Sequence, residues 1–259
     1  MTASVHPRQD ASAQYLLRLA DTCLILGQRL SEWCGHAPII EEDIALSNTA
    51  LDLIGQARAL LTHAGRSEAG SPLLDEDQLA FLREEREYRN VTLVELPRGD
   101  FAFTVLRNVM VASFLKLLWQ RLASSSDAEL AAIAGKAVKE ARYHQQHAGD
   151  WVLRLAGGTD ESRRRTEAGL AQLWRYTAEL FEADAIDDAA AASGLGPRWS
   201  ELREPWLAEM NQLLAEAQLS APQDSAFRST GKRGVHSEHL GHMLTEMQYL
   251  QRAFPGGVW

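Results

Sequence analysis

A carboxylate and a histidine stand one helical turn apart in the middle of the sequence. Glu140 and His144 lie within Leu130 to Leu155, where small and apolar residues recur at alternating steps of four and three, the spacing of one helix face. His144 is the polar member of that face. Inward carboxylates and histidines are the ligands of carboxylate-bridged metal bundles. The pair therefore has two interpretations: a hydrogen-bonded structural pair, or a relict or altered metal site.

The other ligands of a di-metal centre are missing from the sequence. Such a centre takes one Glu from each of two helices and a Glu-x-x-His pair from each of the other two. No histidine has Asp or Glu three residues before it, and no Asp, Glu or His occurs between Asp100 and Asp127. Asp52 has glycine three residues later and is expected to point away from the core face of its helix. The sequence therefore predicts no metal in this chain, and Glu140 and His144 remain the relict candidates.

Two further groups of titratable residues are weaker candidates for a site. At 100° per residue the histidines near the C-terminus spread over too wide an arc to reach one ion, so capping, surface or core roles are expected for them: His236, His239 and His242. Three acidic residues are expected to be solvated or to lie in an interface: Glu179, Asp184 and Asp188.

A basic, glycine-containing loop precedes the last predicted helix. In Ser229 to Gly234, Lys232 and Arg233 are candidates for contacting a phosphate or a partner, because helix N-termini attract anions. The loop lacks the P-loop pattern, with no strand before it and no Ser or Thr after the lysine. An ordinary connector is the alternative interpretation.

Composition limits the classes of function that are open to the chain. The 259 residues carry a net charge of −9, which argues against nucleic acid as the main partner. The apolar run Val109 to Trp119 contains Lys116 and is too short to span a bilayer, so no membrane contact is expected. Cys23 and Cys34 are eleven residues apart on one predicted helix, too far to form a disulfide at about 1.5 Å rise per residue. With a polar N-terminus, the chain is expected to be cytoplasmic.

Helical periodicity extends over nearly the whole chain and predicts an all-α fold. Residues 1–259 are expected to form one domain, with residues 1–10 as a flexible tail and an antiparallel bundle of four long helices at its centre. The predicted bundle helices are 11–33, 41–64, 101–123 and 130–155. Further helices are predicted at 78–90, 162–192, 200–218 and 236–253. On the first helix, Asp21 is expected to lie opposite the apolar face.

Two of the bundle helices carry apolar residues on more than one face. The helix at 101–123 is apolar on nearly all sides and the helix at 11–33 has a second apolar stripe. A helix of this kind lies at the centre of a bundle or in an interface. A monomer is expected to leave part of this surface wet, so the sequence predicts a stable complex with another helical subunit and possible self-association.

Long stretches of the chain resemble one family. The PaaC-type subunits of bacterial phenylacetyl-CoA epoxidases are similar to this chain over about residues 15–254, and the resemblance is carried by LILGQRLSEWCGHAP, IALSNTALDLIGQARALL, AVKEARYHQQHAGDWVLRL, LWRYTAELFEADAID and GVHSEHLGHMLTEMQYLQR. The resemblance implies a ferritin-like four-helix bundle with additional packed helices, acting in phenylacetate breakdown.

The resemblance also implies how the work is divided among subunits. The di-iron centre is expected in a homologous PaaA-type catalytic partner, and a reductase component is expected to deliver electrons from NADPH. This chain is then a non-catalytic structural subunit that binds no cofactor of its own. The family supplies no ligand motif that can be placed on these residues.

Two other functions remain open at the level of the sequence. One is an independent metal-dependent oxygenase with an atypical site around Glu140 and His144. The other is a free-standing helical binding protein. A neighbouring gene for a bundle protein with a complete set of metal ligands would favour the structural-subunit interpretation over both.

Overall fold

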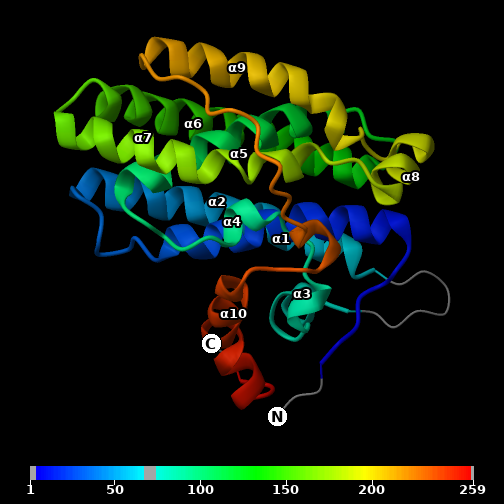
Figure 1. Ribbon diagram of the computed structural model, residues 1–259. Helices are drawn as coiled ribbons and strands as arrows, with labels where there is room; N and C mark the ends of the chain where they lie inside the picture. Colours follow the sequence, from blue (N-terminus) through cyan, green and yellow to red (C-terminus); the bar gives the residue numbers. More distant parts are fainter. Residues whose placement is uncertain (1–3, 67–73, 258–259) are drawn as a thin grey trace.

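Four long helices form the centre of the computed structural model, which describes residues 4–66 and 74–257. They are Ala11–Ser31 (α1), Ile40–Ala64 (α2), Phe101–Leu122 (α5) and Ala128–Ala156 (α6). α1 packs along α2, α5 packs along α6, and α2 contacts α6 across the two pairs (Figure 1). The predicted all-α class and the ferritin-like four-helix bundle are confirmed.

Local sequence signals account for where these helices begin. Three N-cap aspartates each accept a hydrogen bond from the backbone N–H three residues later, which satisfies a free donor of the first turn: Asp10, Asp100 and Asp127. α2 has no such cap, but its first turn carries Glu41, Glu42 and Asp43. These negative side chains interact favourably with the positive N-terminal end of the helix dipole. Each of the four predicted ranges therefore matches the structure to within two residues at either end.

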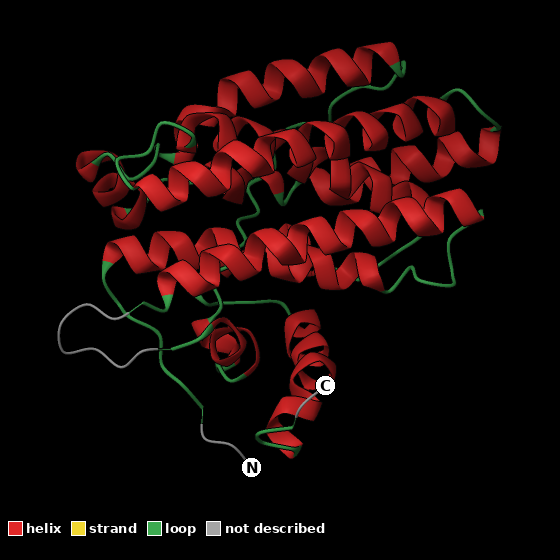
Figure 2. Cartoon of the chain, turned by 180° about the vertical axis from the view of Figure 1, so that it is seen from behind, coloured by secondary structure: helices red, strands yellow, loops and turns green. Residues whose placement is uncertain are grey.

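Shorter helices add layers on both sides of the bundle. The α-helices are Glu76–Phe81 (α3), Thr92–Glu95 (α4), Asp160–Trp174 (α7), Ala185–Ser193 (α8), Arg203–Glu216 (α9) and Glu238–Ala253 (α10). Four 3₁₀ turns lie at Glu85–Glu87, Thr177–Phe181, Trp199–Leu202 and Gly231–Arg233. α9 lies over the α5–α6–α7 layer, and α10 and α3 lie beyond α1 (Figure 1). All regular elements of the described residues are helical (Figure 2).

The predicted helix at 162–192 is wrong as a single element. It is divided into α7, the 3₁₀ turn Thr177–Phe181 and α8. The backbone is extended at Asp184, and the Asp184 side chain accepts hydrogen bonds from the N–H groups of Ile186 and Asp187. This capping side chain starts a new helix instead of continuing the old one, because an aspartate at an N-cap competes with helical backbone pairing.

The start of the chain and the segment after α2 also differ from expectation. The predicted helix at 78–90 is only α3, followed by the 3₁₀ turn Glu85–Glu87. Residues 4–10, expected as a tail, lie along this segment: Val5 N–H donates to the Leu82 carbonyl at 3.0 Å, and Pro7 is buried. Between α2 and α3, residues 67–73 lie outside the described residues.

The surplus apolar faces of α1 and α5 are covered within the chain. α1 packs against α2, α4 and α8, and α5 packs against α6, α7 and α9. By length and composition the whole of α5 is a candidate membrane span, whereas the run Val109 to Trp119 alone is too short to be one. However, 83% of the apolar window of α5 is buried in the protein. Core helices of soluble proteins pass the same test, so α5 is weak evidence for a membrane. The expectation that these faces would stay wet in a monomer is wrong.

The covering is unequal on the two sides of the bundle. The side of α1 and α5 carries α4, α7, α8 and the strap, residues 217–237, which runs from α9 across the layers to α10 (Figure 1). α2 packs against α1, α6 and, near its end, α3. Its outer face is exposed at Ile40, Ile44 and Leu51. We refer to these two sides as the covered side and the bare side.

Candidate functional site

The histidine of the predicted pair is bonded to a residue on another helix. His144 Nε2 and Asp52 Oδ2 are hydrogen-bonded at 2.9 Å, with His144 only 5% exposed. Glu140 instead accepts a hydrogen bond from Gln56 Nε2 at 2.8 Å. The prediction that Glu140 is the partner of His144 is therefore wrong, as is the outward orientation of Asp52. α2 lies alongside α6. Asp52 and Gln56, one turn apart on α2, bond to His144 and Glu140, one turn apart on α6.

Histidine–carboxylate pairs recur along the contact between α2 and α6. His147 Nε2 lies 3.1 Å from Glu42 Oε2, and the Tyr143 ring stacks on the His147 ring. Burial lowers the pKa of His144, although the hydrogen bond and charge of Asp52 oppose that shift. The hydrogen bond between the buried His144 imidazole and the half-exposed Asp52 carboxylate therefore joins α6 to α2.

The residues in this region do not fit a di-iron centre. Glu140 is engaged by Gln56, and the Cys23 thiol donates to Gln56 Oε1 at 3.6 Å. Burial raises the pKa of the Cys23 thiol well above its usual range, which keeps it protonated, whereas a metal ligand is a thiolate. α5 supplies no carboxylate or imidazole. Within 4–66 and 74–257, no group of three or more His, Cys, Asp or Glu side chains is placed to hold a metal ion.

The basic loop of the strap turns its donors inward. Lys232 is 3% exposed, and its Nζ donates to the Glu182 carbonyl at 2.7 Å and lies 5.1 Å from the centre of the Trp199 ring. Burial lowers the pKa of Lys232 to about 8. Arg233 is half exposed and pairs with the Glu182 carboxylate at 3.0 Å. Lys232 therefore anchors the strap and does not offer its charge to a phosphate in solvent.

One buried carboxylate organises that loop. Glu179, 1% exposed, accepts hydrogen bonds from Thr92 N–H at 2.9 Å, Ser229 Oγ at 2.6 Å and Lys232 N–H at 2.8 Å. The expectation of a solvated Glu179 is wrong, because α4 and the strap close over it. Asp184 also lies in the protein, paired with the buried Arg18, whereas the exposed Asp188 pairs with Arg198.

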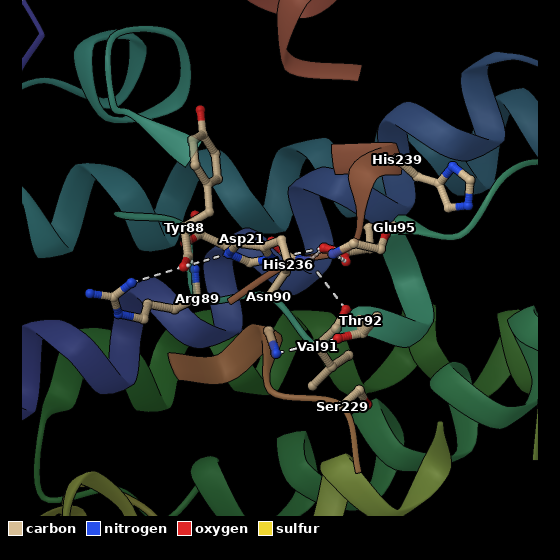
Figure 3. Close-up of polar contacts among 12 residues, drawn as sticks. Asp21, Tyr88, Arg89, Asn90, Val91, Thr92, Glu95, Ser229, His236 and His239 are labelled. Atoms are coloured by element: carbon tan, nitrogen blue, oxygen red, sulfur yellow. Dashed lines mark hydrogen bonds and ion pairs between the residues drawn. The ribbon is translucent and has the colours of Figure 1, made fainter. Parts of the chain in front are cut away.

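A second buried carboxylate fastens the other end of the strap (Figure 3). Glu95 is fully buried and accepts from Ser237 N–H at 2.6 Å and Asn90 Nδ2 at 3.0 Å, and it lies 2.8 Å from His236 Nδ1. Burial lowers the pKa of His236, but the hydrogen bond and the charge of Glu95 together outweigh it and leave that pKa raised. His239 lies apart from this network (Figure 3), so the three C-terminal histidines do not form one cluster.

A buried ion pair joins α1 to the segment that follows α3. Arg83 Nη1 donates to Asp21 Oδ2 at 3.0 Å, and both side chains are 0% exposed. Arg89 N–H donates to the same oxygen at 2.8 Å. Asp21, expected on the outer face of α1, is therefore interior, because the segment after α3 folds over that face.

Sequence patterns alone missed most of this network. For Glu95 a signal was present: it interrupts the apolar run Val91 to Leu96, and a carboxylate in such a run needs a buried partner. For Asp21 no local signal existed, because its partner is 62 residues away in a segment whose fold depends on that contact.

The fold defines a class of protein: an all-α, ferritin-like bundle enlarged by additional packed helices. The chain belongs to the phenylacetic acid catabolic protein family, whose model matches residues 2–259. It is 50% identical over 245 residues to the C-type subunit of 1,2-phenylacetyl-CoA epoxidase from Escherichia coli (strain K12), an alignment that covers 95% of this chain and 98% of that protein. The predicted resemblance to this family is confirmed.

Proposed function

We propose that this chain is a subunit of a 1,2-phenylacetyl-CoA epoxidase that acts in phenylacetate catabolism. The observation that carries the proposal is the 50% identity to the C-type subunit of such an enzyme, spread over nearly the full length of both chains. Agreement over the whole length includes the strap and the covering helices, so it extends beyond the four-helix core that many unrelated functions share.

Within that complex the chain has a structural, non-catalytic role. The support is chemical: α5 has no possible ligand, Glu140 and His144 are bonded to Gln56 and Asp52, and Cys23 is held as a thiol. A di-iron centre of this kind needs a carboxylate from each of the four helices and a histidine from two of them. We propose that the iron belongs to a homologous catalytic partner, that a reductase component supplies electrons from NADPH, and that the complex is cytoplasmic.

Metal analysis tests the structural role directly. The purified chain, reconstituted with ferrous iron and desalted, is expected to retain far less than one iron per chain. The matched sample is this chain co-expressed with the homologous PaaA-type catalytic partner (the A-type partner), and that complex is expected to retain iron. Close to two irons on this chain alone would contradict the non-catalytic role and favour the rival function, an independent metal-dependent oxygenase around Glu140 and His144.

Activity measurements test the division of labour. Turnover of phenylacetyl-CoA with NADPH and the reductase is expected only when both bundle subunits are present. Replacing Glu140 by Gln in this chain is expected to leave turnover unchanged, whereas replacing a ligand carboxylate in the partner is expected to abolish it. Turnover by this chain and the reductase alone would contradict the proposal.

A further inference from the structure

A small cavity is formed by the end of α7, the 3₁₀ turn Thr177–Phe181, the start of α9 and the strap. Its volume is about 200 Å³, which is less than the pocket of a drug-sized ligand. It lies apart from the contact between α2 and α6, because none of the residues that line it belongs to either helix. The cavity therefore has room for a small molecule, and the chemistry of its walls decides which kind.

Three aromatic side chains form one wall of the cavity. The centre of the Trp206 ring lies 5.5 Å from that of Trp174 and 5.3 Å from that of Phe181. Trp206 is 1% exposed, and its Nε1 donates to the Met110 carbonyl at 2.9 Å, so the ring is fixed in place. A rigid wall of aromatic rings favours a ligand that is itself an aromatic ring, which meets it stacked or edge-on.

The rest of the lining is charged, and two of its arginines have no acidic partner. The two carboxylates that line the cavity are already paired with other arginines, at 3.0 and 3.4 Å respectively: Glu182 with Arg233, and Asp224 with Arg203. In the described part of the chain, Arg175 and Arg228 form no ion pair and contact only aromatic rings or backbone carbonyls. The cavity thus has positive charge that the chain itself does not neutralise.

Both of these arginines are held in position with part of the guanidinium unused. The Arg175 guanidinium lies over the Phe227 ring, 4.1 Å from its centre, a contact that uses its face and leaves its edge N–H groups free. Arg228 Nη1 donates to the carbonyls of Ser225 and Phe227 at 2.5 and 2.8 Å, and no acceptor among the described residues bonds to its Nε or Nη2. Such an edge matches a carboxylate, which accepts two parallel N–H donors.

We propose that this cavity binds a small aromatic carboxylate. The ring of the ligand packs on the aromatic wall, and its carboxylate accepts hydrogen bonds from Arg175 and Arg228. A neutral aromatic molecule would leave the guanidiniums unmatched, and an inorganic anion would leave the aromatic wall unused. The volume is too small for a coenzyme A thioester, so the site is separate from that of the proposed enzyme's substrate. The proposal does not depend on the proposed function, because the ligand binds this chain alone.

Titration calorimetry of the full-length chain tests the class of ligand, with phenylacetate as the probe. Phenylacetate is expected to bind at one site per chain. Phenylacetamide has nearly the same shape without the charge, and inorganic phosphate has charge without the ring. Both are expected to bind at least about 10-fold more weakly than phenylacetate, the effect of losing a charged hydrogen bond or the apolar contact. Equal binding of either compound would overturn the proposal, as would the absence of phenylacetate binding.

Substitutions test where the ligand binds. Arg175→Ala and Arg228→Ala are each expected to weaken phenylacetate binding by about 10-fold. Ala178→Leu, which enlarges a side chain in the cavity lining, is expected to weaken it further. The matched control is Arg142→Ala, because Arg142 is an exposed arginine of α6 that does not line the cavity. This control is expected to bind as the unchanged chain does, and thermal melts confirm that each variant is folded.

The contrary results differ in meaning. If Arg175→Ala and Arg228→Ala bind phenylacetate as tightly as the unchanged chain, the ligand lies elsewhere and the site is overturned. If Arg142→Ala weakens binding as much as they do, general surface charge holds the ligand, which overturns the site as well. Neither result affects the proposed subunit function, since that is measured by turnover in the presence of the A-type partner.

Discussion

The covered and the bare sides of the bundle handle charge in opposite ways. On the covered side, carboxylates such as Asp21, Glu95 and Glu179 are removed from water and bonded to several donors each. On the bare side, pairs such as His144–Asp52 keep one partner half exposed. In a buried pair, loss of one member strands the other in a low dielectric, whereas water can replace a lost partner at an exposed site. The covered side is thus held by polar contacts, and the bare side remains available for binding.

The largest expected effect comes from breaking the pair beneath α3. Arg83→Ala leaves Asp21 buried without its counter-charge, which is expected to lower the free energy of unfolding by about 3–5 kcal/mol. Chemical denaturation monitored by circular dichroism measures the loss. The control is Arg164→Ala, which removes an exposed partner of Glu161 and should cause no measurable change. Equal losses for the two variants would mean that the two ion pairs do not differ as the structure indicates.

The double replacement Asp21→Asn with Arg83→Met sharpens this result. With both charges removed, the desolvation cost of each disappears, and buried ion pairs replaced by apolar or neutral groups often lose little stability. The double variant is therefore expected to be more stable than Arg83→Ala. A double variant as unstable as the single one would show that shape, and not charge, makes the contribution.

A smaller effect is expected at the anchor of the strap. Glu179→Ala removes the acceptor of three donors, two of them backbone N–H groups, at a cost of roughly 2–3 kcal/mol. Hydrogen exchange should accelerate in residues 229–235 before the bundle helices lose protection. Asp188→Ala serves as the control, because Asp188 is exposed and its carboxylate pairs with the exposed Arg198. Unchanged exchange in the strap would contradict the anchoring role of Glu179.

The sequence predicted the bundle well and the covering poorly, for one physical reason. The helices α1, α2, α5 and α6 are long and periodic, and three of them start at capping aspartates, so local information fixes their bounds. The covering segments are short and are positioned by contacts such as Arg83–Asp21 and Lys232–Glu179 between residues far apart in the chain. No local period encodes such contacts.

The candidate site shows the same limit. The missing ligands of α5 were visible in the sequence, because absent residue types do not depend on helix bounds. The partner of His144 was not visible: Glu140 on the same helix was the local choice, but packing of α2 beside α6 supplies Asp52 instead. Asp52 lies near the edge of its helix face, where the neighbouring α6 supplies its partner His144. Asp21 lies on the face of α1 that the segment after α3 covers, and neither contact can be located from the sequence of one helix.

A modest effect is expected from exchanging partners on the bare side. Asp52→Asn is expected to lower the pKa of His144 further, because the hydrogen bond and charge of Asp52 both raise it. Glu140→Gln should lower this pKa less, since Glu140 acts on His144 by charge alone. A pH titration of the imidazole signals by nuclear magnetic resonance measures both shifts. A larger shift for Glu140→Gln would restore Glu140 as the partner of His144.

The smallest expected effect concerns two histidines, His236 on the covered side and His144 on the bare side, whose contributions to stability change with pH in opposite directions. His236 faces Glu95, and its raised pKa means that the folded state binds its proton more tightly than the unfolded state. Its stabilisation is complete below the ordinary pKa of 6.5 and is lost as pH rises through the raised value. His144 faces Asp52, Glu140 and His147, and its lowered pKa means that stability is lost as pH falls from 6.5 through the lowered value.

Denaturation of the unchanged chain, His236→Gln and His144→Gln across pH 5 to 8 isolates each contribution. The loss from His236→Gln is expected to shrink as pH rises, and removing His144 is expected to flatten the decline at acid pH. Two difference curves of the same sign would mean that the two sides do not differ in how they hold a proton.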